Sequence, residues 1–382
     1  MYPVAVPVAQ IMIGRLRTVL NELEKIPALR LPPRYQQVSR LIEYYQRGRL
    51  VLVLGAGVSS DHGLPSWNTL LQKLLLSTIM REKLETAEMS QVLARIYTEL
   101  FSPNPLVAAR YLYNFYRRSE ATDPMAFERA IREAIYEEIK ADEEFELLKE
   151  IRRLCIAAGK SPNLDSIITY NYDDLLEAYL TKMDIDIQFR SIHAAGMNPG
   201  VGELPIYHVH GYLPREGALT ENNRVTLSED FYHRQYNDIY GWSNLVQINK
   251  FKDYNCLFIG ASFSDPNLRR LLDIAKVQRG DSRVHHYSFR KRYDAKSVEG
   301  SLEAYLVQHA DVLDEKTKAG LGLGKVAESL VRMVERFEDE DATSFGISTI
   351  WVQDFAEIPD ILASIRKMGP PQLTPGAPGG IS

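Results

Sequence analysis

Apolar positions along the chain predict buried strands that alternate with amphipathic helices. The short apolar runs that are typical of buried strands span residues 50–54, 165–170, 205–210, 256–260, 284–289 and 347–352. Apolar residues at 70, 71, 74, 75 and 79 recur at helical spacing, and the chain from about 82 to 158 looks wholly helical. Strands separated by helices predict an α/β fold, with a Rossmann-like, mostly parallel sheet and helices on both faces.

The two ends of the chain differ from this α/β core. Apolar residues at 13, 16, 20, 23 and 26 predict one helix, and a second helix at about 35–46 leads into the first strand. We therefore expect residues 1–48 to form an N-terminal helical extension, which either packs on its own domain or contacts another subunit or a partner. Residues 369–382 are rich in Pro and Gly and predict a disordered tail. Residues 49–368 are expected to form one domain with a helical insert at about 68–160, in which Asp123 before Pro124 predicts a helix start.

Composition and charge narrow the functional classes. The 382 residues carry a net charge of −5, which disfavours direct, sequence-independent binding to nucleic acid. Neither a signal peptide nor a run of about 18 apolar residues is visible, so we expect a cytoplasmic protein without a membrane span. The two cysteines, Cys155 and Cys256, are too few for a structural zinc site and are expected to be buried free thiols. No metal site is predicted.

The first segment that carries chemistry is the glycine-rich turn after the first predicted strand, "LVLVLGAGVSSDHGLPSW". Glycines let the backbone approach a phosphate, and a helix that follows the turn could offer its N-terminal amides. The residues concerned are Gly55, Ala56, Gly57 and Ser59. Their spacing matches neither the usual dinucleotide fingerprint nor a Walker loop. A tight structural turn remains the alternative, and Trp67 is either a wall of the pocket or a core residue.

Two polar segments follow at the ends of later strands. "TYNYD" places Asn171 and Asp173 where open parallel sheets bind ligands, although both residue types are also common in turns. In "YHVHGY", strand alternation would put His208 and His210 on the same face, and His210 beside Gly211 is the better placed for a cleft. Two such histidines could instead be structural or bind a metal, but no third metal ligand is evident.

The fourth segment, "LFIGASFSDPNL", repeats the design of the first turn. A predicted strand runs into Gly260 and Ser262, and Asp265 with Pro266 starts a helix. Two such junctions could hold the two ends of a dinucleotide.

In this order, the four segments resemble the sirtuin family. The Gly-Ala-Gly-x-Ser turn, the Thr-x-Asn-x-Asp segment, the His-Gly pair and the Gly-x-Ser turn stand at matching relative places. The resemblance covers roughly residues 48–290, together with the closing strand and helix near 345–368. "GLPSW", "LSEDFYHRQY" and "GASFSDPNLRRLL" look like the branch of sirtuin-like domains that acts in bacterial anti-phage defence.

The chain departs from deacetylating sirtuins in two places. Those enzymes carry a four-cysteine zinc module, whereas this chain has two cysteines and a long helical insert instead. Asn68 also stands where the deacetylase loop has an arginine. Both departures argue against lysine deacetylation. The branch that the chain resembles implies hydrolysis of NAD, with NAD as the substrate and no metal.

The resemblance implies roles for ten residues. Asn171 would order the attacking water, Asp173 would bind the nicotinamide amide, and His210 would act as the general base. The remaining contacts to NAD would come from Gly55, Ala56, Gly57, Ser59, Trp67, Gly260 and Ser262.

The resemblance also implies partners. A homo-oligomer is expected, together with a HerA-type hexameric ATPase as the second component of a defence system. Two other functions stay open: an NAD-dependent protein ADP-ribosyltransferase or deacylase, and a non-catalytic sensor of NAD or ADP-ribose that regulates a partner ATPase or nuclease. The acidic balance disfavours a nuclease subunit, and the glycine spacing disfavours a dehydrogenase.

Overall fold

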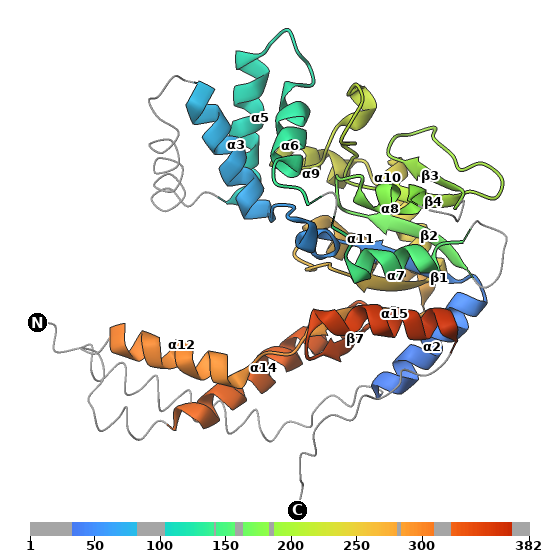
Figure 1. Ribbon diagram of the computed structural model, residues 1–382, viewed down its shortest axis with the longest axis vertical. Coiled ribbons are helices and arrows are strands. Elements are labelled where there is room, and N and C mark those ends of the chain that lie inside the picture. Colours follow the sequence, from blue (N-terminus) through green and yellow to red (C-terminus); the bar gives the residue numbers. More distant parts are fainter. Residues whose placement is uncertain are drawn as a thin grey trace, which may run out of the picture. The chain divides into compact units, whose positions relative to one another are not determined.

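Seven strands form one sheet, part of which can be followed in Figure 1. Their order is β3 (Phe189–Ile192), β4 (Leu204–His208), β2 (Leu164–Thr169), β1 (Leu50–Leu54), β5 (Asn255–Ile259), β6 (His286–Lys291) and β7 (Ile347–Val352). The pairs β1–β2, β1–β5, β2–β4, β3–β4 and β5–β6 all run parallel. Every residue of β1 and of β5 is buried, as expected for central strands that are covered on both faces.

This sheet confirms the predicted α/β class. Each of the six predicted strands is present, with ends that differ by two residues at most. The strand β3 was not predicted, because its four residues are mostly partly exposed and form no continuous apolar run.

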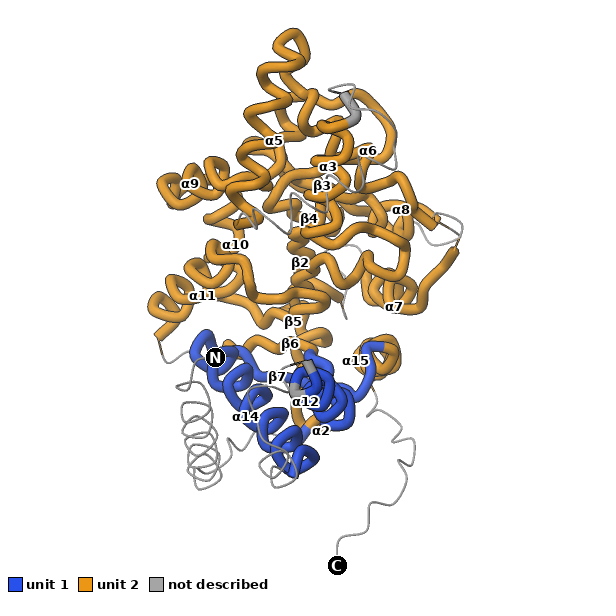
Figure 2. The backbone as a smooth tube through the Cα atoms, turned by 90° about the vertical axis from the view of Figure 1, so that its left-hand side faces the viewer, with its two compact units in different colours: residues 1–33, 290–355 blue, residues 34–289, 356–382 orange. Residues whose placement is uncertain are grey.

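A computed structural model describes residues 33–81, 104–140, 143–156, 163–182, 187–280, 284–308 and 322–368. The predicted first helix near residues 13–26 and the predicted tail at 369–382 lie outside the described residues. The chain divides into a larger unit, residues 34–289 with 356–382, and a smaller unit, residues 1–33 with 290–355 (Figure 2). All ten predicted site residues belong to the larger unit.

Helices cover both faces of the sheet in the larger unit. Figure 2 shows α7 (Glu146–Leu154) and α8 (Leu175–Thr181) on one side of the strands, and α10 (Trp242–Asp253) and α11 (Pro266–Arg279) on the other. The helix α15 (Ile358–Lys367) packs against α7 and against α2 (Arg34–Gln46). A further helix of this unit, α9 (Glu229–Asn237), packs against α11.

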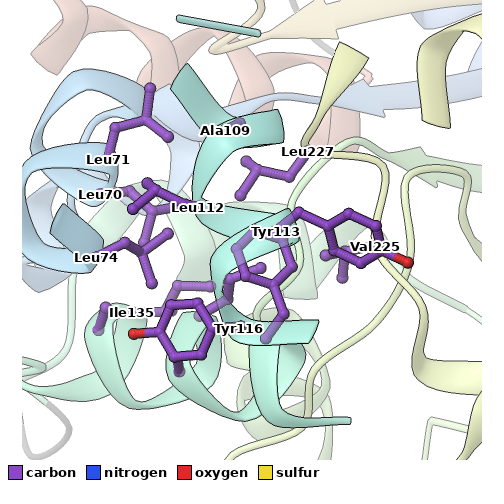
Figure 3. Close-up of a cluster of buried hydrophobic side chains, with 14 of the residues drawn as sticks. Leu70, Leu71, Leu74, Ala109, Leu112, Tyr113, Tyr116, Ile135, Val225 and Leu227 are labelled. Carbon is purple, nitrogen blue, oxygen red and sulfur yellow. The ribbon is translucent and has the colours of Figure 1, made fainter. Parts of the chain in front are cut away.

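The helical insert packs into a core that also contains Tyr172 from the segment after β2 and Leu213, Val225 and Leu227 from the segment after β4. The insert consists of α3 (Trp67–Arg81), α5 (Pro105–Ser119) and α6 (Ala126–Tyr136), which pack against one another. Figure 3 shows how their side chains meet: Leu70, Leu71 and Leu74 from α3, Ala109, Leu112, Tyr113 and Tyr116 from α5, and Ile135 from α6. The helical spacing of positions 70, 71 and 74 is thereby explained by core packing.

Within the described part of residues 82–158, the elements are all helices, as predicted. Turns separate α5 from α6 and α6 from α7. Asp123 accepts a hydrogen bond from the Met125 amide at 3.0 Å, which stabilises a turn, so α6 begins at Ala126 and not at Pro124.

In its described part, the smaller unit contains β7 and two helices, α12 (Ala295–Gln308) and α14 (Leu323–Ser344). The two helices pack against each other, and α14 also packs against β7. Arg290 and Glu338 form an ion pair at 3.2 Å within this unit. Within the described ranges of both units, each helix is too short or too polar to cross a membrane.

Candidate functional site

A cavity of about 800 Å³ lies at the carboxyl ends of β1, β2 and β5. The strands that follow β1 in the chain, β2 to β4, lie on one side of β1, and the later strands, β5 to β7, lie on its other side, so the strand order changes direction at β1. Open parallel sheets bind ligands at such a point, and the volume is typical of ligand pockets. All ten residues predicted for the site line this cavity: Gly55, Ala56, Gly57, Ser59, Trp67, Asn171, Asp173, His210, Gly260 and Ser262.

The two glycine turns lie against each other on the cavity wall. The amide of Gly57 donates to the Gly260 carbonyl at 3.1 Å, and the Gly55 amide donates to Ile259 at 3.0 Å. A Cβ on Gly55 would lie 2.6 Å from the Gly260 oxygen, and one on Gly57 would lie 2.8 Å from the Gly260 Cα. The glycines are therefore required for contact between the turns, whatever they also do for a ligand.

The hydrogen bonds of the first turn determine which of its backbone amides are free to bind a ligand. The amides of Gly55, Gly57 and Ser59 all donate to carbonyl groups of the protein. Ala56 is exposed, and within the described part of the chain its amide has no hydrogen-bond partner. In this turn, Ala56 thus offers the backbone N–H that is free to meet an anion.

The first turn does not lead directly into an α-helix. Two short 3₁₀ turns, Ala56–Val58 and Ser60–His62, come first. Gly63, with a φ of +82°, ends the second of them in a backbone conformation that favours glycine. The helix α3 begins only at Trp67, where the Ser66 hydroxyl accepts from the Thr69 amide at 3.3 Å.

Ser59 connects the first turn with the segment after β2. Its buried hydroxyl donates toward the Asp173 carboxylate at 3.2 and 3.3 Å and accepts from the Asn171 side-chain amide at 3.1 Å. Since Asn171 uses its NH₂ group in this way, its side-chain oxygen has no partner among the described residues. That oxygen is an acceptor available at the cavity.

Asp173 is a buried carboxyl group. Burial raises its pKa to about 6, against the opposing effect of the Leu175 amide, which donates to it at 3.1 Å. The charge of Glu177 acts in the same direction as burial, whereas His208 and Ser59 oppose it. A carboxylate of this kind can accept a hydrogen bond strongly because little water competes for it.

The two histidines of "YHVHGY" do not share an environment, so the expectation of a common face was wrong. The strand β4 ends at His208, and the chain turns through Val209 and His210. Strand alternation therefore does not extend to His210. His210 lines the cavity, between the rings of Tyr170 and Tyr232 at centroid distances of 4.8 and 5.7 Å.

His208 lies behind the cavity wall and is not part of its lining. Its Nε2 lies 2.7 Å from Oε1 of Glu177, and its Nδ1 lies 3.3 Å from the Asn171 carbonyl oxygen. Its ring also contacts the ring of Tyr212 at 4.3 Å. The structure thus places His210, and not His208, at the site.

Asp265 lies where the second turn enters α11. Its Oδ1 accepts from the amides of Asn267 and Leu268 at 2.7 and 2.9 Å, which caps the helix. Its Oδ2 accepts from the Tyr232 hydroxyl at 3.2 Å. The same oxygen lies 3.1 Å from Nε2 of His210, without the alignment of a hydrogen bond. Burial alone would raise the pKa of Asp265, but His210 and the two backbone amides together lower it.

The second turn also contains unusual backbone geometry. Gly260 has a φ of +68°, and Phe263 has a φ of +56°, which is rare for a bulky residue. The Phe263 ring packs on Phe258 at 5.0 Å, and this contact holds the residue in place. Between these two residues, Ser262 is exposed to the cavity, and its hydroxyl is hydrogen-bonded to that of Ser264 at 2.6 Å.

The helical insert supplies the apolar end of the cavity. Trp67 lines the cavity and also packs against the insert core, so both of the roles considered for it are present. Leu70, Leu106 and Ile135 come from the three helices of the insert. Asn104, whose side chain caps α5 through the Leu106 amide at 3.0 Å, lies at the same end.

Sequence reasoning missed several lining residues. Asp265 was recognised only as a helix start, although its position one turn away from a glycine at a strand end could have marked it as a site residue. Tyr170 and Tyr172 lie within "TYNYD" itself, and Tyr232 lies in the quoted segment "LSEDFYHRQY". Tyrosines are as common in cores as in sites, so their type alone gave no signal.

Both cysteines are buried free thiols, as predicted. Across the ranges that the structure describes, no cluster of three or more His, Cys, Asp or Glu side chains could hold a metal ion.

Two comparisons place the chain among known proteins. Residues 165–310 match the family model of the SIR2-like domain. NAD(+) hydrolase ThsA from Enterococcus faecium is 24% identical over 333 residues, which are 86% of this chain and 58% of that protein. The chain therefore spans about three fifths of the length of this curated relative. The resemblance predicted from the four segments is confirmed: the chain is similar to the SIR2-like domain over residues 165–310 and to an NAD(+) hydrolase over 333 residues.

Proposed function

We propose that this chain hydrolyses NAD to nicotinamide and ADP-ribose. The observation that carries the proposal is the single cavity in which Asn171, Asp173 and His210 meet the two glycine turns. The name of the similar protein, NAD(+) hydrolase, supports the same reaction. In that reaction, the bond between the ribose carbon and the nicotinamide nitrogen breaks, and its electron pair leaves with nicotinamide.

Asn171 and Asp173 act on the two sides of this bond. The free side-chain oxygen of Asn171 accepts a hydrogen bond from the attacking water and orients it toward the ribose carbon. Asp173 accepts from the amide of nicotinamide and holds the ring for departure. With a pKa of about 6, Asp173 is mostly ionised at neutral pH and suited to this role.

His210 serves as the general base. Its Nε2 faces Asp265, and its Nδ1 has no hydrogen-bond partner among the described residues. That nitrogen takes a proton from a ribose hydroxyl or from water, while the Asp265 carboxylate stabilises the imidazolium that forms.

The glycine turns bind the rest of NAD. Gly55, Ala56, Gly57 and Ser59 surround the pyrophosphate, with the free amide of Ala56 as the direct donor. Gly260 and Ser262 contact the adenosine half, and Trp67 lies beside nicotinamide.

The test is incubation of the purified chain with NAD, alone and with the product of a neighbouring gene, followed by chromatography of free nicotinamide. Asn171→Ala and His210→Ala should each lower turnover by about 10²–10⁴-fold. His233→Ala is a matched control, because that histidine is exposed on α9 and does not line the cavity. Unchanged turnover in both site variants would refute the assignment, and label from NAD on protein would indicate a transferase instead.

We further propose that the chain acts in the cytoplasm as an anti-phage effector that depletes NAD. A homo-oligomer with a HerA-type hexameric ATPase as partner would restrain such an activity until infection. Removal of residues 1–28, followed by light scattering with and without the ATPase, tests the predicted contact helix. An oligomer of unchanged mass would show that this helix is not the contact.

A further inference from the structure

His208 is a buried histidine for which the proposed reaction has no use. It is 1% exposed, and it links two segments of the larger unit through its two ring nitrogens. On one side is Oε1 of Glu177 in α8 at 2.7 Å, and on the other is the carbonyl oxygen of Asn171 at 3.3 Å. Both of these neighbours are oxygens that can accept a hydrogen bond.

This arrangement determines the charge of the ring. A neutral imidazole has one N–H donor and one bare nitrogen, so it can satisfy only one of two acceptors. Oε1 of Glu177 also accepts a hydrogen bond from the Ser191 hydroxyl at 2.7 Å, so this oxygen acts as an acceptor and not as a donor toward the ring. The ring must therefore carry protons on both nitrogens to make both contacts.

The groups around His208 fit a positive ring. They are Glu177 from α8, Asp173 from the turn after β2, His193 from the segment after β3, and Tyr212 from the segment after β4. The two carboxyl groups favour the positive charge. The neighbouring His193 stays neutral, since burial and then the charge of His208 lower its pKa.

We propose that His208 is a positioning residue, a buried imidazolium that ties Glu177 to the Asn171 carbonyl and so holds the Asn171–Asp173 turn at the cavity. The contact fixes the backbone from which the Asn171 side chain projects. The same positive charge favours the ionised form of Asp173. The effect on turnover rests on the proposed NAD hydrolysis, whereas the charge and contacts of the ring do not.

The first experiment reads the ring directly. The full chain is labelled with ¹⁵N in its eight histidines, and His208→Gln assigns the His208 signals. At neutral pH, both ring nitrogens of His208 should show the shifts of protonated imidazole, and Glu177→Gln should return one of them to the unprotonated position. A neutral His208 ring in the wild-type chain would overturn the proposal, and this reading needs no substrate.

The second experiment tests positioning. Glu177→Gln should lower kcat for NAD by about 10²-fold, the loss expected when a reacting group is displaced by about 1 Å, with a KM within about threefold of wild type. Ser191→Ala is the matched control, because it removes another hydrogen bond to the same Glu177 oxygen, 2.7 Å long, and leaves the ring contact in place. Its kcat should stay near that of wild type.

The outcomes separate the two proposals. A wild-type chain that never cleaves NAD refutes the proposed function, while the NMR result still decides the charge of His208. An imidazolium signal together with an unchanged kcat in a folded Glu177→Gln chain would overturn the positioning role. If Glu177→Gln does not fold, the wild-type NMR spectrum still decides for or against the imidazolium.

Discussion

The two glycine turns of the cavity look alike in sequence but are built differently. After β5, the second turn leads within six residues into α11 and contains its own helix cap, Asp265. After β1, the first turn passes through two 3₁₀ turns, and the carboxylate that holds it, Asp173, comes from another strand end. The second turn is thus held by local contacts, whereas the first depends on segments far away in sequence.

The two carboxyl groups differ in the same sense. Asp265 receives two helix amides and the neighbouring His210, so its pKa is lowered although burial opposes this. Asp173 has no cation in direct contact, and burial raises its pKa to about 6. A local helix start thus stabilises a buried charge, and a site built from distant segments leaves its charge less stabilised.

The largest change in the free energy of unfolding is expected at Gly260, where the two glycine turns meet. Gly260→Ala would need a φ of +68° and would put its Cβ 2.6 Å from the Val58 amide nitrogen. We expect a loss of about 3–5 kcal/mol in the free energy of unfolding, because the strain of positive φ adds to overpacking. Gly280→Ala is the matched control, with a φ of +56° and open space around it, and should lose only about 1 kcal/mol. Equal losses in urea denaturation would show that the contact between the turns carries no energy.

The second change in the free energy of unfolding concerns Asp173, the less stabilised of the two carboxyl groups. Asp173→Asn should stabilise the fold by about 3 kcal/mol at neutral pH, because the pKa is about 6 in the folded state and 3.8 for the free group. Below pH 3.8 both states are protonated and the gain vanishes. Between pH 3.8 and about pH 6, Asp173 loses its proton in the unfolded chain but keeps it in the folded chain. The wild-type free energy of unfolding therefore falls as pH rises, and the stability gained by Asp173→Asn grows. Above about pH 6 this gain levels off.

Urea denaturation at several pH values measures this gain, and nicotinamide release should fall in the same variant. A gain that is equal at pH 3.5 and pH 7 would contradict the assigned pKa. A destabilised variant at pH 7 would show that the carboxylate is better stabilised than its surroundings indicate.

A smaller loss in the free energy of unfolding is expected when the first turn is changed at Gly57, which contacts Gly260. Gly57→Ala puts a Cβ 2.8 Å from the Gly260 Cα, but its φ is not in the positive range. Overpacking alone should therefore cost about 1–3 kcal/mol, less than Gly260→Ala. Thermal unfolding of the two variants side by side gives the order, and the reverse order would locate the strain in the first turn.

The smallest losses in the free energy of unfolding are expected when the helix caps that follow the two turns are removed. Asp265→Ala should cost about 1–2 kcal/mol, because a buried cap to two amides is lost. Ser66→Ala should cost about 0.5 kcal/mol, since its hydrogen bond from the Thr69 amide is exposed and, at 3.3 Å, long. Asp265→Asn should recover most of the loss, as Asn also caps helices. Similar losses at both caps, measured by urea denaturation, would remove the distinction between the junctions.

Much of the fold could be predicted from the sequence because buried strands such as Leu50–Leu54 and Asn255–Ile259 are continuous apolar runs between turn residues. The ten candidate site residues were implied by the resemblance of the four segments to the sirtuin family, and strand ends that meet at one edge of a parallel sheet gave a separate reason to expect these segments close together. The separate surroundings of His208 and His210 could not be predicted, since they depend on where β4 ends. The pairing of Asp265 with His210 joins segments 55 positions apart, which no local pattern encodes.

The position of Trp67 has a practical consequence. Its indole lines the cavity at the start of α3, while Trp242 and Trp351, which complete the three tryptophans of the chain, are not part of the lining. Replacement of those two by phenylalanine would leave a single tryptophan, at the cavity wall, which can be excited at a longer wavelength than the tyrosines. Its emission would then report occupancy of the cavity in unlabelled protein, including by compounds that bind and are never cleaved.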